Sequence, residues 1–184
     1  GDGPVQMAAL EMARELNAPG VTRVLFESLA AAAPPMKVSL IEALRQRGDP
    51  AAAPLLAALV KAPDSAVRLA AVGALGELGD ASAVTALLEA AGSADEPEMR
   101  AGRQALLVLK RGDVTHALIG HLTAGQPASR AEAARALAGR GDKDAVGGLI
   151  AAEQENPDPV RAALFSALGQ LAGAKDVPAL VAGG

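Results

Sequence analysis

Hydrophobic residues between Pro63 and Ala91 follow the period of an α-helix. In the first half of this segment they recur at steps of three and four residues, which places them on one helical face. They are Val67, Ala70, Ala71, Ala74, Leu75 and Leu78. Gly79 is placed to end this helix and Asp80 to cap a second one, whose apolar stripe follows. That stripe is Val84, Leu87, Leu88 and Ala91. The pattern predicts a helical hairpin with a longer first helix and a shorter second helix.

Similar hairpins recur along the chain, four of them with Gly-Asp at the turn; the most divergent copy, the first, has Asn17-Ala18-Pro19-Gly20 there. The turn glycines are Gly48, Gly79, Gly112 and Gly141, at spacings of 31, 33 and 29 residues, with a looser copy from Gly173 to Asp176. Such variation is normal for helical hairpins, whose loops absorb a residue or two. One hairpin buries too little apolar surface to offset its conformational entropy, so the copies must stack. We expect one all-α array of about six repeats. Their approximate ranges are 5–33, 35–62, 63–95, 96–126, 127–156 and 157–184.

A basic residue stands seven positions before a leucine in five of the predicted first helices. These residues form a basic series of Lys37, Arg68, Arg100, Arg130 and Arg161, which precede Leu44, Leu75, Leu107, Leu137 and Leu168. We expect each cation to play a structural part by bonding to a helix-end carbonyl or to a turn aspartate. The turn aspartates are Asp49, Asp80, Asp113 and Asp142. Phosphate binding by the series is the alternative.

The composition suits thin, closely stacked helices. The chain of 184 residues is 51% hydrophobic and contains no Trp or Tyr, so Phe26 and Phe165 are its only aromatic rings. Alanine, the best helix former, lets neighbouring backbones approach. The net charge of −4 gives no general attraction for nucleic acid or an anionic membrane. The absence of cysteine excludes disulfides, thiol nucleophiles and thiolate metal sites.

Two segments carry a resemblance to a known family. Ala66 to Ala90, AVRLAAVGALGELGDASAVTALLEA, and Pro159 to Leu171, PVRAALFSALGQL, resemble bacterial HEAT-like repeats, including those of the phycobilisome-lyase type. The shared pattern is a Val-Arg start, a run of small residues, a Gly-Asp turn and an Ala-Val-x-x-Leu second helix. The resemblance implies a right-handed α-solenoid whose second helices line a concave surface that binds other macromolecules.

Enzymes that resemble this fold have signatures that are absent here. Iron-dependent hydroxylases of similar fold carry several His-Glu pairs. In this chain Ala117 follows His116 and Leu122 follows His121, so it has no such pair. The two histidines would lie about 140° apart around a helix, whereas a helical metal pair needs a spacing of three or four residues. The chain lacks cysteine and an aromatic pocket, so none of its residues corresponds to those that bilin lyases would need. We therefore expect no catalytic residues, no cofactor and no metal site.

The expected partner is a protein or peptide on the concave face of the second helices. The positions between the core residues of those helices would meet it. They are Arg23, Glu27, Lys61, Thr85, Glu89, His116 and His121. The alternatives are a structural spacer in a multidomain protein and, less favoured, a lyase-like or metal-dependent modification enzyme. Nucleic acid is disfavoured because these positions offer little aromatic surface and no basic run.

Charged residues, Pro and Gly interrupt every apolar run, so we expect no membrane insertion. We expect a monomeric array or one part of a larger chain. The start of the sequence, GDGPVQ, has no basic and apolar regions of a signal peptide. The location is open between the cytoplasm and an exported, periplasmic form.

Overall fold

The computed structural model describes residues 21–182 and shows an all-helical α-solenoid in this part of the chain. Longer first helices alternate with shorter second helices. The first helices are α3 (Pro34–Arg47), α5 (Ser65–Leu78), α7 (Glu96–Val108), α9 (Pro127–Arg140) and α11 (Asp158–Leu171). The second helices are α2 (Val21–Ala31), α4 (Ala53–Leu59), α6 (Val84–Ala91), α8 (Val114–Gly120), α10 (Val146–Glu153) and α12 (Val177–Ala182). The first helix expected in repeat 5–33 lies outside the described residues.

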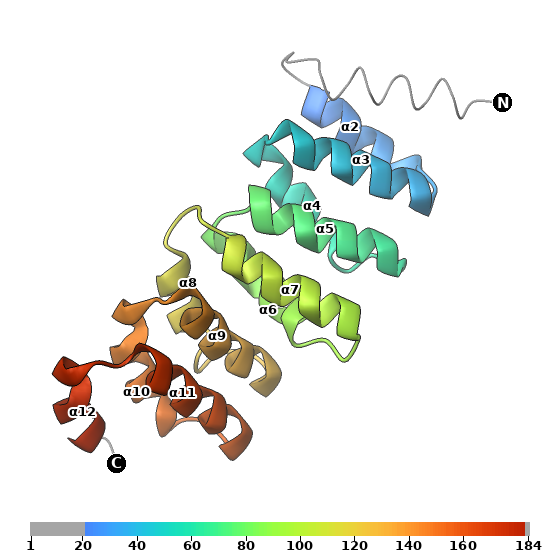
Figure 1. Cartoon of the computed structure of the whole chain (residues 1–184). Helices are drawn as coiled ribbons and strands as arrows, with labels where there is room; N and C mark the ends of the chain where they lie inside the picture. Colours follow the sequence, from blue (N-terminus) through green and yellow to red (C-terminus); the bar gives the residue numbers. More distant parts are fainter. Residues whose placement is uncertain (1–20, 183–184) are drawn as a thin grey trace.

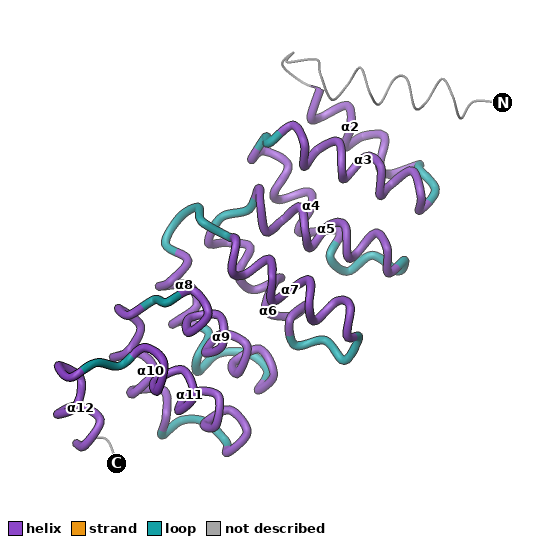
Figure 2. Tube along the Cα trace, viewed as in Figure 1, coloured by secondary structure: helices purple, strands orange, loops and turns teal. Residues whose placement is uncertain are grey.

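The helices follow one another in chain order, from α2 at one end of the array to α12 at the other (Figure 1). Short loops join most of them (Figure 2). Four of the second helices are entered through a turn of 3₁₀-helix. These turns are η1 (Pro50–Ala52), η2 (Ala81–Ala83), η3 (Lys143–Ala145) and η4 (Ala174–Asp176).

Local sequence signals set the helix ends. Asp64 and Asp95 cap α5 and α7 because each side chain accepts a hydrogen bond from a backbone N–H of the first turn. A proline in the first turn begins α3, α7, α9 and α11, where its missing N–H costs little. Gly48 and Gly141 end α3 and α9 with φ of 67° and 71°, a left-handed conformation that favours glycine.

The core repeats at a fixed interval of 31 residues. In the first helices the buried positions are Leu44, Leu75, Leu106, Leu137 and Leu168. In the second helices they are Leu56, Leu87, Leu118 and Leu149, at the same interval. Leucines from both layers therefore form one continuous core. The unequal spacing of the turn glycines is confined to the turns; Gly112, for example, lies two residues later than a 31-residue step from Gly79 would place it.

This interval corrects the predicted register of the fourth repeat. Leu106 is 1% exposed and occupies the core position, whereas Leu107, the predicted counterpart of Leu75, is 41% exposed. The same step places Met99, not Arg100, at the position of Arg68. The physical reason is the cap: Asp95 lies 31 residues after Asp64 and starts α7 in that register, and the extra turn residues follow only after the helix.

Neighbouring first helices are not equally close. At Gly76 of α5 an added Cβ would lie 2.7 Å from Cα of Ala105, so the glycine permits α5 and α7 to touch. The corresponding residue of α7 is Leu107, and an added Cβ at Gly139 of α9 would lie 2.8 Å from its Cδ2. A leucine where the previous repeat has glycine holds α7 and α9 farther apart. Accordingly, α7 and α9 pack less extensively than α5 with α7 or α9 with α11.

Candidate functional site

The second helices place four of the predicted partner-binding residues in two cross-repeat pairs. Lys61 Nζ, just beyond α4, lies 2.8 Å from Glu89 Oε2 of α6. Thr85 Oγ1 of α6 lies 3.0 Å from Nε2 of His121 at the end of α8, within hydrogen-bond distance. These pairs connect three successive repeats along one surface. We call Lys61, Thr85, Glu89, His116 and His121 the second-helix surface.

Three predicted partner-binding residues remain: His116, Glu27 and Arg23. His116 is exposed on α8, and its backbone N–H donates to Asp113 Oδ1 at 2.9 Å. Glu27 is exposed on α2. Arg23 also lies on α2, but its side chain is outside the described part of the structure. The structure therefore brings Lys61 to Glu89 and Thr85 to His121, and His116 belongs to neither pair.

The two histidines do not contact the same residues. His121 faces Thr85 across the repeat boundary, while His116 lies near the start of α8. Within residues 21–182, no three His, Cys, Asp or Glu side chains are grouped closely enough to hold a metal ion. The same part of the chain has no helix that is long and apolar enough to cross a membrane.

Two arginines of the basic series bond to carbonyls at the repeat boundaries. Arg68 Nη1 donates to the carbonyls of Ala62 and Pro63, both at 3.0 Å. Arg130 Nε donates to the Gly125 carbonyl at 3.0 Å, and its Nη1 donates to Asn156 Oδ1 at 3.3 Å. Each guanidinium thus ties the start of its helix to the loop before it, as expected for carbonyl partners.

The other members of the basic series depart from the expected pattern. Arg100 pairs with Glu96 one turn earlier in α7, because the shifted register places it on the exposed face. Arg161 Nε donates to Glu153 Oε1 at 2.9 Å, and its guanidinium lies 5.9 Å from the Phe165 ring centre. The Lys37 side chain makes no hydrogen bond or ion pair within the described residues. None of these bonds reaches a turn aspartate: within the described residues, the ionic partners of the series are Glu96, Glu98, Glu153 and Asp158.

The turn aspartates instead cap helices and connect repeats. Asp49, Asp80 and Asp113 accept backbone N–H bonds at the start of the following helix. Hydrogen bonds from the Thr22 hydroxyl and the Ala51 N–H lower the pKa of Asp49. Those from the Ser82 hydroxyl and N–H lower the pKa of Asp80. Asp142 differs because it makes no such cap; its carboxylate accepts from Thr115 Oγ1 at 2.8 Å and from Arg140 Nε at 2.9 Å.

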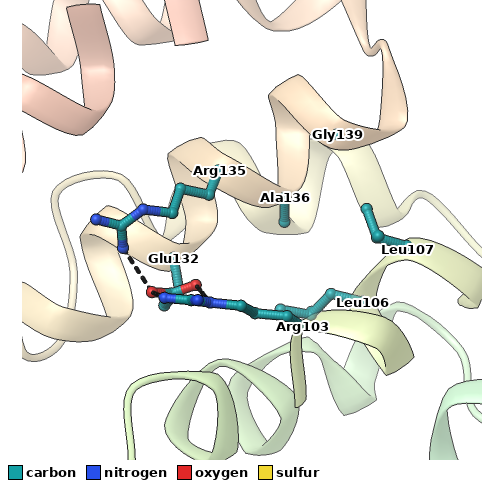
Figure 3. A pocket seen from close by; sticks show the side chains of 7 residues that line it. All are labelled: Arg103, Leu106, Leu107, Glu132, Arg135, Ala136 and Gly139. Carbon is teal, nitrogen blue, oxygen red and sulfur yellow. Dashed lines mark hydrogen bonds and ion pairs between the residues drawn. The ribbon is translucent and has the colours of Figure 1, made fainter. Parts of the chain in front are cut away.

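An ionic cluster between α7 and α9 has no counterpart in the sequence-based expectations. Glu132 of α9 is 5% exposed and accepts from Arg103 Nε at 2.8 Å and Nη2 at 2.7 Å. Its Oε1 also accepts from Arg135 Nη1 at 2.5 Å. Figure 3 shows the carboxylate between the two guanidinium groups. The hydrogen bonds to Glu132 raise the pKa of Arg103. We call these three residues the Arg-Glu-Arg cluster.

The 31-residue interval reveals this cluster in the sequence. Arg103 occupies the position that holds Ile41, Val72, Ala134 and Phe165 in the other first helices. Ile41, Val72 and Ala134 are buried there, so a charged residue at this position needs a partner on the next helix. The corresponding partner is Glu132, at the position of Ala70. The predicted register was one residue out in α7 and concealed the substitution.

A cavity of about 160 Å³ adjoins the Arg-Glu-Arg cluster. Its other walls are aliphatic: Leu106 and Leu107 of α7, and Ala136 and Gly139 of α9. In Figure 3 these residues lie beside the charged groups along the two helices. The cavity exists because Leu107 separates α7 from α9 without filling the space between them.

The repeated helical hairpins and their shared leucine core define an α-solenoid built from tandem repeats. The chain belongs to the HEAT-repeat family: a sequence profile described as HEAT repeats matches residues 22–107 and 115–183. A comparison with curated proteins finds no match. Among solved structures, human deoxyhypusine hydroxylase in complex with glycerol is similar over 96% of this chain and 82% of its own. The identity is 23% and the TM-score 0.40, which says nothing about the activity of this chain.

Proposed function

We propose that this chain is a non-catalytic interaction module whose second-helix surface binds a protein or peptide. The observation that supports it is the pairing of Lys61 with Glu89 and of Thr85 with His121. These contacts align polar side chains at the ends of α4 and α8 and on α6 into one surface that spans three repeats. A partner that lies along the array can meet all of them together.

The chemistry of this surface favours an elongated polar partner. Glu89 is 49% exposed and Lys61 is 72% exposed, so both retain access to solvent while paired. The surface has no Trp, Tyr or Arg anchor of the kind that dominates tight interfaces. We therefore expect moderate affinity distributed over several repeats, with the partner supplying the larger side chains.

Quantitative affinity capture tests this function. The second-helix variant Thr85→Glu, Glu89→Lys, His116→Glu changes the proposed surface at exposed positions. A control variant, Ser166→Glu, Gln170→Lys, Gln104→Glu, changes exposed positions on the first helices. Proteins recovered with the unaltered chain should be lost with the second-helix variant and kept with the control, while circular dichroism stays the same. Equal recovery by both variants would contradict the proposal and favour a spacer role.

A further inference from the structure

We propose a second docking site at the junction of α7 and α9, where the cavity beside the Arg-Glu-Arg cluster takes an aliphatic side chain of an acidic peptide segment. The site is on the first helices and is therefore distinct from the second-helix surface. Its two parts are an aliphatic hollow and an adjacent pair of guanidinium groups (Figure 3).

The shape of the hollow selects the aliphatic part of the occupant. A volume of about 160 Å³ has room for one leucine side chain, and the walls facing it are Leu106, Leu107, Ala136 and Gly139. Leu107 is 41% exposed, although its size would favour burial. A side chain that enters the hollow covers Leu107 and removes apolar surface from water, which stabilises the complex.

The charges beside the hollow select an acidic occupant. Two guanidinium groups share one carboxylate, so the Arg-Glu-Arg cluster carries one excess positive charge. Arg103 holds Glu132 through two nitrogens, whereas Arg135 contributes one bond through Nη1. The Arg135 side chain is also 51% exposed. A guanidinium has five N–H donors, so Arg135 can bind a peptide carboxylate in addition to Glu132.

A second hollow extends the site in one direction. Glu132 and Arg135 also line a cavity of about 240 Å³ that reaches Met99 on α7, Pro127 at the start of α9 and Val160 on α11. The Arg-Glu-Arg cluster therefore stands between two hollows. This arrangement fits a peptide that runs along α9, from its first turn toward its last, with its carboxylates over Arg135 and an aliphatic side chain on either side.

The corresponding positions in the neighbouring repeats carry different residues. Val72 and Ala134 are fully buried where α7 has Arg103, and Gly76 allows close helix contact where α7 has Leu107. The opening between α7 and α9 thus depends on two residues that differ from their equivalents in the array. Both differences act on the same cavity, one by adding charge and the other by separating the helices.

Methyl NMR titration tests the site with a defined probe, the peptide acetyl-Asp-Leu-Asp-amide. It should shift the methyl signals of Leu106, Leu107 and Ala136 in a saturable way. Acetyl-Asn-Leu-Asn-amide, which lacks the carboxylates, and acetyl-Asp-Gly-Asp-amide, which lacks the leucine, should each bind about fivefold more weakly or worse. No saturable shift of these methyl groups, or equal binding of all three peptides, would overturn the proposal.

Two variants separate the charged and aliphatic parts of the site. Arg135→Gln removes the exposed guanidinium and leaves Arg103 to hold Glu132, so the fold is retained and the affinity for the acidic peptide should fall about fivefold. Gly139→Ala places a Cβ against Leu107 and pushes that side chain into the hollow, which should abolish binding. The matched control is Gly169→Ala in α11, whose added Cβ meets nothing within 4 Å. If Arg135→Gln binds as the unaltered chain does, or Gly169→Ala loses binding as Gly139→Ala does, the site is not as proposed.

Discussion

Thr115 Oγ1 donates a hydrogen bond to Asp142 Oδ2 at 2.8 Å, and Thr22 makes the same bond to Asp49 at 2.5 Å. In both pairs the residues are 27 positions apart. The threonine is the second residue of one second helix, and the aspartate belongs to the turn of the following repeat. The bond therefore fixes the register between adjacent repeats at their turn ends. At the equivalent place in α6, Thr85 instead faces His121.

The lowered pKa of Asp80 predicts a specific loss of stability in acid. Because folding lowers this pKa, the ionised side chain stabilises the folded state above the unfolded pKa of about 4, and the contribution is lost as pH falls through the folded pKa. Asp80→Asn should therefore unfold more readily than the unaltered chain at neutral pH, with a smaller difference near pH 3. Urea unfolding at both pH values measures this change.

Ser82 supplies the control for this pH dependence. Its hydroxyl and its N–H both donate to Asp80 Oδ1, and the hydroxyl bond at 2.6 Å is the larger cause of the lowered pKa. Ser82→Ala should reduce the acid sensitivity in part, since the backbone bond remains. A stability profile that is identical in Asp80→Asn and the unaltered chain from pH 3 to pH 7 would contradict the assigned role.

Leu106 and Leu107 provide a direct test of the register in the fourth repeat. Leu106→Ala should destabilise the fold by about 2–5 kcal/mol because it opens a cavity in the core. Leu107→Ala should cost about 1 kcal/mol or less, since the side chain is already 41% exposed. Chemical unfolding of the two variants gives the comparison. A greater cost for Leu107→Ala would restore the register in which Leu107 is the counterpart of Leu75.

The helical hairpins could be predicted because their signals are local. Apolar residues at three- and four-residue steps, capping aspartates and first-turn prolines each act within one or two helical turns. The register of α7 could not be obtained from one spacing, because Arg100 and Leu107 stand as far apart as Arg68 and Leu75. It depends on where Asp95 starts the helix. The correct alignment required the leucine positions of all first helices together.

The sites were harder to predict than the fold because they depend on contacts between repeats. The sequence predicts Lys61 and Glu89 separately as exposed positions, but their ion pair depends on how α4 and α6 stack. Arg103 and Glu132 are 29 residues apart, and neither is unusual alone. Their pairing becomes evident only when the 31-residue interval places Arg103 where other repeats have buried apolar residues. Inter-repeat chemistry is thus hidden until the register is known.

Arg68 and Arg100 should differ in their effect on stability. Arg68→Ala removes two bonds to backbone carbonyls at a half-buried site and should cost about 1–2 kcal/mol. Arg100→Ala removes an exposed pair within one helix and should cost about 0.5 kcal/mol or less. Urea unfolding of both variants is the measurement. Similar losses would mean that the two arginines hold equivalent positions after all.

Removing one partner of the Arg-Glu-Arg cluster should destabilise the fold, whereas replacing Arg103 and Glu132 together by apolar residues should not. Arg103→Val leaves the Glu132 carboxylate, which is 5% exposed, with Arg135 alone and should destabilise the chain by about 3 kcal/mol. The double variant Arg103→Val, Glu132→Ala reproduces the residues that α5 carries at these positions, Val72 and Ala70. It should recover most of the loss, because apolar side chains of suitable size often replace a buried ion pair without net cost. A double-mutant cycle with Glu132→Ala as the other single variant checks this, and purely additive losses would argue against a direct pair.

The side chain of Asn156 joins the fourth and fifth repeats by hydrogen bonds. Its side chain is buried, and Nδ2 donates to the Leu122 carbonyl at 2.9 Å and to the Ala152 carbonyl at 2.7 Å. Asn156→Ala deprives both carbonyls of a donor and should cost about 1–3 kcal/mol. Asn156→Asp should be at least as harmful, because a carboxylate cannot donate to either carbonyl. Gln170→Ala, an exposed change on α11, serves as the control in thermal unfolding. If Asn156→Ala unfolds at the same temperature as that control, the two carbonyls do not depend on Asn156.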